Sequence, residues 1–257
     1  MIIQNAACIP VYLYKDNYRI SLHNEKLKGK KINAMLGLTS EGDQIILSPY
    51  NMERLVSTSD LNNLSMYLNL IDFKGRQTVN DLDLRQITSP PEQSEYLEIF
   101  LNQHFNLENS YISYKNIGNT ESELILLYIF YQTRKFNKFN DEINGTFTIS
   151  IDTTSNNENI KLSNYVDRTL SKLPIKQIIT QMNYDELSYG YLDIIGKNGE
   201  RLEYLPLYFI NDYRSKEIYL DGIVIDFEKS FYCNRNIVDY SQMDPNDINP
   251  IVLTFIY

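Results

Sequence analysis

The acidic side chains best suited to chemistry lie close together near the end of the chain. Asp221, Asp226 and Glu228 form the carboxylate cluster of the 257-residue sequence that most suggests catalysis. Glycoside hydrolysis needs two carboxyl groups about 5–9.5 Å apart in a cleft. On a strand, residues 226 and 228 point to one face and residue 221 points to the other. We therefore interpret these groups as solvated carboxylates of turns and expect no catalytic residues among them.

The other candidates for catalysis or metal binding are isolated in the sequence. The two histidines, His23 and His104, stand in neither metal-ligand nor triad-like spacing. Asp244 and Asp247 enclose a Pro-Asn pair and offer oxygen ligands for calcium, although this pattern is more typical of a turn. No glycine-rich nucleotide-binding motif, GxSxG or HExxH is present. We expect no enzymatic activity, no cofactor and no bound metal.

Cysteine content and charge restrict the compartment and the partners. Cys8 and Cys233 are too few for a disulfide framework, and two buried free thiols are favoured over a single bridge. The net charge of −9 argues against general nucleic-acid binding, which needs an excess of Lys and Arg. The amino-terminal residues lack the pattern of a signal peptide, and no apolar run approaches the ~18 residues of a membrane span. The sequence predicts a protein made in a cytoplasm, without a transmembrane segment.

The elements that must position any site are predicted to be strands. Short segments rich in Ile, Val, Tyr, Phe and Thr alternate with clusters of Asn, Asp, Gly and Pro, which predicts an all-β protein. Helical periodicity is confined to Met52–Leu64 and Tyr165–Leu173. Without long amphipathic helices, the strands are expected to form antiparallel sandwiches. The polar stretch Gln132–Gly145 lacks alternation and is interpreted as a linker.

Two pairs of segments indicate an internal duplication. Tyr67–Gly75 (YLNLIDFKG) matches Tyr191–Gly199 (YLDIIGKNG), each ending in a glycine where a tight turn requires positive φ. Phe105–Ile112 (FNLENSYI) matches Ile225–Tyr232 (IDFEKSFY) in the same order along the chain. The offsets are 124 (191 − 67) and 120 (225 − 105), a drift that loop insertions explain. Chance likeness between Tyr- and Ile-rich strands is the alternative, and the collinear matches favour duplication.

The duplication predicts two domains, each an eight-stranded antiparallel β-sandwich. The first is expected to span residues 1–135, with an insertion near residues 41–62, and the second to span residues 136–257. Repeat, strand count and size together resemble the double jelly-roll family of viral capsid proteins, in its small bacteriophage-type form. The resemblance implies a homotrimer whose six sandwiches form a pseudo-hexameric tile of an icosahedral shell. It also implies contacts with other virion proteins, location in the virion after synthesis in the host cytoplasm, and no sequence-specific nucleic-acid binding.

The sequence is also compatible with other functions. A vertex, ring or tail-adaptor protein of a virion is also built from tandem sandwiches. A carbohydrate-binding protein would place aromatic side chains together at one loop end, and the absence of Trp counts against it. A glycoside hydrolase or lyase would need a close pair of strand carboxylates.

Overall fold

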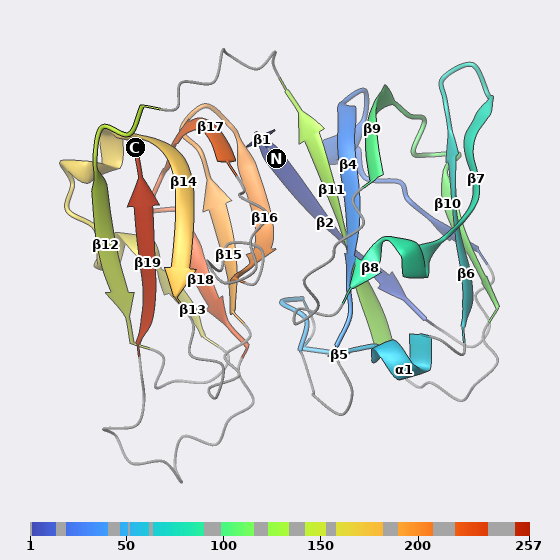
Figure 1. Cartoon of the computed structure of the whole chain (residues 1–257), viewed down its shortest axis with the longest axis horizontal. Coiled ribbons are helices and arrows are strands. Elements are labelled where there is room, and N and C mark those ends of the chain that lie inside the picture. Colours follow the sequence, from blue (N-terminus) through green and yellow to red (C-terminus); the bar gives the residue numbers. More distant parts are fainter. Residues whose placement is uncertain are drawn as a thin grey trace, which may run out of the picture. The chain divides into compact units, whose positions relative to one another are not determined.

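The structure is a computed structural model that describes residues 2–13, 19–40, 47–50, 52–61, 64–89, 99–115, 123–133, 142–152, 158–181, 190–207, 219–235 and 250–257. Strands dominate these residues, so the all-β prediction is confirmed (Figure 1). The helices of the described part are single turns, and none is long and apolar enough to pass through a bilayer. They are α1 (Thr58–Leu61) and the 3₁₀ turns Glu25–Leu27, Leu84–Gln86, Leu162–Asn164 and Leu170–Lys172.

The chain forms two compact units. The first unit comprises Ala7–Thr133, and the second comprises Met1–Ala6 together with Arg134–Tyr257. The domain boundaries predicted from the sequence assign the first six residues to the first domain. They belong to the second unit because β1 (Ile2–Ile3) pairs in parallel with a strand of that unit.

The first unit contains two sheets of four strands. One has the order β2-β11-β4-β9 and the other the order β3-β10-β6-β7. Two further short strands, β5 (Arg54–Leu55) and β8 (Thr88–Ser89), pair in parallel with β11 and β4. The eight principal strands are β2 (Asn5–Tyr12), β3 (Arg19–Ser21), β4 (Lys31–Leu38), β6 (Ser65–Ile71), β7 (Gln77–Asp83), β9 (Ile99–His104), β10 (Tyr111–Lys115) and β11 (Glu123–Gln132).

The second unit repeats this arrangement. One sheet has the order β12-β19-β14-β17, extended by β1, and the other has the order β13-β18-β15-β16. In chain order, both units join their first, eighth, third and sixth strands in one sheet and their second, seventh, fourth and fifth strands in the other. The strands are β12 (Thr146–Ile151), β13 (Asn159–Lys161), β14 (Pro174–Gln181), β15 (Gly190–Ile195), β16 (Arg201–Pro206), β17 (Tyr219–Val224), β18 (Phe231–Asn234) and β19 (Ile251–Ile256).

Alternating apolar side chains fill the space between the sheets. In β6, Met66, Leu68 and Leu70 are fully buried and Ser65, Tyr67 and Ile71 are partly exposed, whereas Asn69, at the register shift, is buried. A strand with one buried face shows this period of two. The alternation of apolar and polar residues in the sequence therefore indicates which face of the strand packs against the core.

The connection between the third and fourth strands is longer in the first unit. It contains β5 and α1, whereas β14 and β15 are separated only by residues 182–189. The helix predicted over Met52–Leu64 is limited to Thr58–Leu61, because residues 54–55 pair as a strand. The helix predicted over Tyr165–Leu173 is only the 3₁₀ turn Leu170–Lys172.

The pairing of the fourth and fifth strands contains the same irregularity in both units. The register shifts at Asn69 in the first unit and at Asp193 in the second, and the first unit has one further shift, between Leu70 and Ile71. On the fifth strand, Asp81 and Tyr204 each have a φ of 47° at this point. Positive φ is uncommon at non-glycine residues, so the shared position is a detailed correspondence between the units.

A buried serine joins the turn before the seventh strand to the end of the fourth strand. In the first unit, Ser110 Oγ accepts a hydrogen bond from the backbone N–H of Ile71 (3.0 Å) and donates one to the carbonyl of Asn106 (2.8 Å). The side chain is only 1% exposed. It therefore pairs two backbone groups where water has no access, which a buried backbone requires.

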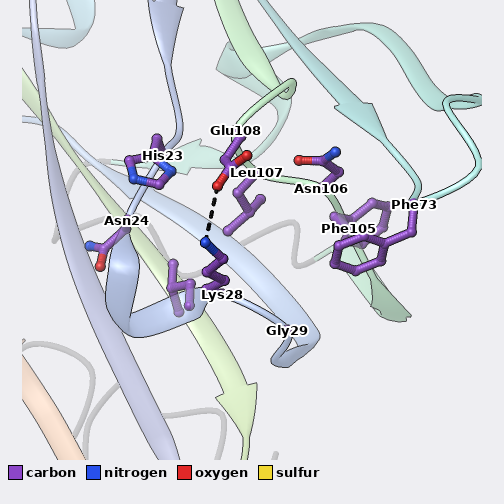
Figure 2. A pocket seen from close by; sticks show the side chains of 10 residues that line it. His23, Asn24, Lys28, Gly29, Phe73, Phe105, Asn106, Leu107 and Glu108 are labelled. Atoms are coloured by element: carbon purple, nitrogen blue, oxygen red, sulfur yellow. Dashed lines mark ion pairs between the residues drawn. The ribbon is translucent and has the colours of Figure 1, made fainter.

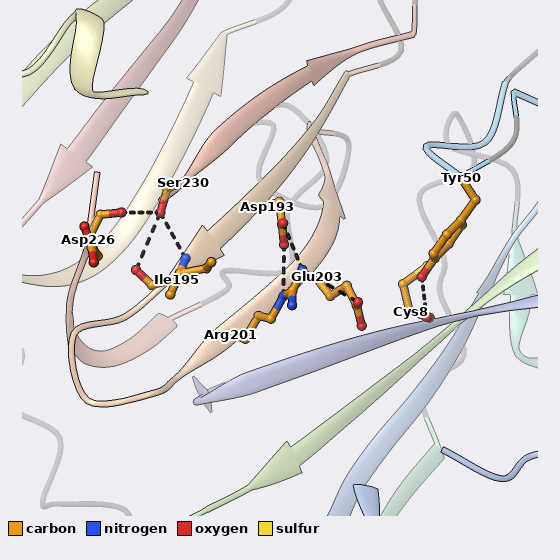
Figure 3. A network of polar contacts seen from close by, with 8 residues as sticks. All are labelled: Cys8, Tyr50, Asp193, Ile195, Arg201, Glu203, Asp226 and Ser230. Atoms are coloured by element: carbon orange, nitrogen blue, oxygen red, sulfur yellow. Dashed lines mark hydrogen bonds and ion pairs between the residues drawn. The ribbon is translucent and has the colours of Figure 1, made fainter. Parts of the chain in front are cut away.

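The second unit contains the same connection. Ser230 Oγ accepts from the N–H of Ile195 (3.0 Å) and donates to the carbonyl of Asp226 (2.9 Å), as Figure 3 shows. Ser230 is fully buried. The identical Ser110 and Ser230 of the sequence match thus perform one structural role twice.

We predict that Ser110→Ala and Ser230→Ala each lower the free energy of unfolding by about 1–3 kcal/mol, because each leaves the N–H of Ile71 or Ile195 without the hydroxyl that accepts its hydrogen bond. Urea unfolding measures the effect. Ser150→Ala, at an exposed position of β12, is the matched control and should leave the unfolding midpoint unchanged. Equal midpoints for all three variants would contradict the assigned role.

Candidate functional site

A charged group that includes two buried carboxylates lies on the fourth and fifth strands of the second unit. Arg201 donates from Nε to Asp193 Oδ1 (3.3 Å) and from Nη2 to Asp193 Oδ2 (3.1 Å), and its Nη2 is 3.8 Å from Glu203 Oε1. Figure 3 shows the three side chains converging. Asp193 and Glu203 are 7% and 5% exposed, so their charges depend on neighbours rather than on water. The group is a charged triad at the register shift.

The electrostatics of this triad are those of a stable ion pair. Burial alone lowers the pKa of the Arg201 guanidinium, but the charge and hydrogen bonds of Asp193 outweigh burial and raise that pKa above its ordinary value. Burial, followed by the negative charge of Asp193, raises the pKa of the neighbouring Tyr204 hydroxyl. Neither shift brings a group toward titration near neutral pH, where a general acid or base would act.

The first unit carries a neutral version of the same group. Gln77 Nε2 donates to Asn69 Oδ1 and to Asn80 Oδ1 (2.7 Å). The strand registers place these three residues where the second unit has Arg201, Asp193 and Glu203. An amide triad in one unit therefore corresponds to a charged triad in the other. All three positions differ, yet both sets bridge the same register shift, which is a structural task.

Both units also have a pocket at the same end. In the first unit, Figure 2 shows His23 and Lys28 from the segment after β3, Phe73 from the turn after β6, and Phe105 and Glu108 from the turn before β10. Lys28 Nζ is 3.5 Å from Glu108 Oε1, and both are exposed. This pocket has a volume of about 100 Å³. That volume is below the range of about 300–1,000 Å³ typical of small-molecule sites.

The corresponding pocket of the second unit is larger and more polar. Its volume is about 870 Å³, and the equivalent segments contribute Ser163, Arg168, Lys197 and Glu228. Lys197 occupies the place of the exposed Phe73, and Ser163 the place of His23. The two pockets share their position, a basic residue (Lys28 or Arg168) and a glutamate (Glu108 or Glu228), whereas most of their other lining residues differ. Their position follows from the repeated turns.

The carboxylates that the sequence grouped together have separate partners. Asp221 Oδ2 in β17 accepts from Gln4 Nε2 (3.1 Å). Asp226 pairs with Lys229 Nζ at 2.9 Å, and this hydrogen bond lowers the pKa of the Asp226 carboxyl. Glu228 accepts from Ser163 Oγ (3.2 Å). Asp226 and Glu228 lie in the turn before β18, as predicted, but Asp221 lies within strand β17, so its interpretation as a turn carboxylate is wrong.

The remaining residues considered from the sequence do not form a site in the described ranges. His23 is exposed and 3.0 Å from Glu25, and His104 is exposed in β9 opposite Lys31. Asp244 and Asp247 lie outside the described residues. Among the described residues, no group of three or more His, Cys, Asp or Glu side chains is arranged to hold a metal ion.

The cysteines are free thiols, and both are buried. Burial raises the pKa of the Cys233 thiol to about 12. The interpretation of two buried free thiols is therefore confirmed, and the alternative of a bridge is wrong. A thiol in this state is chemically inert, because the thiolate is the reactive form.

Comparison with known proteins adds no relative. No protein-family model, no curated protein and no solved structure matches this chain. Function must therefore be argued from the fold and from the residues described above.

We predict that Arg201→Gln lowers the free energy of unfolding by about 2 kcal/mol, because two buried carboxylates lose their guanidinium. The triple variant D193N/R201Q/E203N copies the amides of the first unit and should recover most of this loss. Urea unfolding at low and high salt measures both variants. A triple variant as unstable as Arg201→Gln would show that the two triads are not interchangeable.

We also predict that Cys233 resists iodoacetamide at pH 8 in the folded protein, because a thiol with a pKa of about 12 is almost entirely protonated there. In denaturant, both cysteines should react. Mass spectrometry of the intact protein and its peptides counts the modified thiols. Rapid modification of folded Cys233 would contradict the burial described.

Proposed function

We propose that this protein is a virion structural protein, a capsid subunit built as a double jelly roll. In this proposal, three copies form a pseudo-hexameric trimer, and trimers tile an icosahedral shell with other virion proteins. The protein is made in the host cytoplasm and resides in the virion. Its net charge of −9 suits a shell component that does not bind nucleic acid directly.

The observation that carries the proposal is the strand order. A jelly roll has eight strands in two sheets and contains two Greek keys. The order first-eighth-third-sixth in one sheet and second-seventh-fourth-fifth in the other fits that description, and it occurs in both units. Lectins and cupins also use single jelly rolls. The tandem pair within 257 residues is what favours a capsid subunit.

The side chains support a structural role over a catalytic one. The residues that match between the units are those that close turns, such as Ser110 and Ser230. Most of the residues that line the two pockets differ, apart from the equivalent Glu108 and Glu228. In a protein whose fold serves as a building unit, we expect residues that stabilise turns to be shared between the units and residues that line pockets to vary.

Two alternatives remain useful as comparisons. A ring, vertex or tail-adaptor protein would use the same units with a different cyclic order. A carbohydrate-binding protein would use the pocket of the second unit, where Glu228, Ser163 and Arg168 can bind hydroxyl groups. The aromatic cluster expected of such a protein is not found among the described residues, because the strongly exposed aromatics are Phe73 and Tyr165, one in each unit.

We predict that the purified protein forms a trimer of about 90 kDa, three times 30.2 kDa, and larger shells or sheets as its concentration rises. Light scattering gives the mass, and negative-stain imaging gives the symmetry. A monomer at every concentration would count against the capsid role. A ring of another order would favour the adaptor alternative, and binding on a glycan array that Glu228→Gln abolishes would favour a lectin.

A further inference from the structure

One side of the second unit is closed by the segment Ile2–Ala6. The outer edges of the fifth and sixth strands, β16 and β17, form this side. We call it the flank of the unit. Ile3 pairs in parallel with Leu220 of β17 and is only 1% exposed. Gln4 is fully buried and donates to Asp221 Oδ2 (3.1 Å). The segment thus covers the edge of one sheet.

The same segment also covers the edge of the other sheet. Asn5 Oδ1 accepts from the backbone N–H of Arg201 (2.9 Å), and Ala6 pairs in parallel with Leu202 of β16. Asn5 and Ala6 are at most 1% exposed. Five consecutive residues therefore satisfy both edges of the flank, which would otherwise present unpaired backbone groups.

Among the described residues, no strand covers the flank of the first unit. Its strands are β7 and β9, and β7 is the end strand of its sheet in the described part of the chain. Gln77, Thr78 and Asn80 are exposed on β7, whereas Arg201–Pro206 of β16 is largely buried. By strand register, Val79 occupies the position of Leu202. The first unit thus has the acceptor edge without a covering segment among the described residues.

The second unit has a counterpart of the covering segment. The second strands correspond with an offset of 140 (159 − 19), since β3 and β13 pair with the seventh strand in the same register. The same offset places Ile143 at the position of Ile3 and Thr146 at the position of Ala6. Ile143 is 64% exposed, the most exposed large apolar side chain among the described residues. Ile3 is therefore buried, whereas Ile143, at the equivalent position, is exposed.

We infer that residues Glu142–Thr146 of one chain dock on the flank of the first unit of a second copy. Ile143 would then be buried as Ile3 is, and Thr146 would pair with Val79 as Ala6 pairs with Leu202. One contact would cover both the open edge of β7 and the exposed isoleucine. We take a second copy as the occupant, because the segment ahead of the first unit covers the second unit, and repeating that connection carries the segment ahead of the second unit onto the first unit of another chain.

This inference rests on the proposed self-assembling function and specifies one of its contacts. Each chain carries one donor segment and one acceptor flank, which makes the contact heterologous. Heterologous contacts produce closed rings when the rotation between copies closes, and open filaments when it does not. A ring of three chains is the outcome that agrees with the capsid proposal.

The test mixes two single-cysteine additions. Protein with Val79→Cys and protein with Thr146→Cys are combined, oxidised mildly and separated without reductant. Directly paired strand residues have Cα atoms close enough for a disulfide, about 4.4–6.8 Å. We expect a covalent dimer only in the mixture. The matched control is Ser150→Cys, exposed on the same strand and about 13 Å further along, which should give no dimer with Val79→Cys.

A second variant tests the contact without a cross-link. Ile143→Asp places a charge at an exposed position, so folding should be unchanged, and association should weaken at least tenfold by light scattering. If the parent protein assembles but the 79–146 dimer is absent and Ile143→Asp assembles normally, the docking inference is overturned and the capsid proposal stands. If the parent protein never assembles, both fail.

Discussion

The structure depends on satisfying backbone groups at the ends of two closely packed sheets. Where the chain leaves the fourth strand, the N–H of Ile71 or Ile195 is bonded by a serine hydroxyl. Ser110 and Ser230 accept from this N–H and donate to a carbonyl of the turn before the seventh strand, which also accepts a backbone N–H. An apolar side chain in place of the serine would leave the N–H unpaired. The neighbouring turn with Gly75 or Gly199 at positive φ and the pocket beside it take their positions from this connection.

Although both units contain this serine connection, they differ in the charges of side chains at equivalent positions. The amide triad and the charged triad bridge the same register shift by different chemistry, and the pockets at the same end have different linings. An Arg in place of Gln77 without acidic partners would set a charge beside the neutral amides of Asn69 and Asn80. The acidic partners therefore belong with it, and the three positions form one energetic unit. The fold therefore requires a polar group that bridges the register shift, whereas the charge of that group differs between the units.

Much of the fold could be predicted because its main signals are local. The alternation of Met66, Leu68 and Leu70 with polar neighbours reports one buried face, and the glycines at 75 and 199 report tight turns. The repeat was visible because the buried serines and the apolar strand residues allow few replacements. The match of Glu108 with Glu228 indicated an equivalent turn, although both side chains are exposed.

The features that were missed depend on distant pairing. Nothing local in Ile2–Ile3 shows that these residues pair with β17 rather than with the strands that follow them. The triads were hidden because Asn, Gln, Asp and Arg at these positions resemble ordinary solvent-exposed residues until the register shift brings them together. The grouping of Asp221 with Asp226 and Glu228 was only sequential, since their partners lie on different elements.

The pairing of the earliest residues with β16 and β17 affects how the protein is synthesised. These partners follow the segment by roughly 200 residues, which at about 5–20 residues per second leaves it waiting on the order of 10–40 s. During that time the first unit can complete its own sheets. A fusion partner placed ahead of Ile2 would therefore be encoded beside the first unit but attached physically to the second, where it would burden the later folding step.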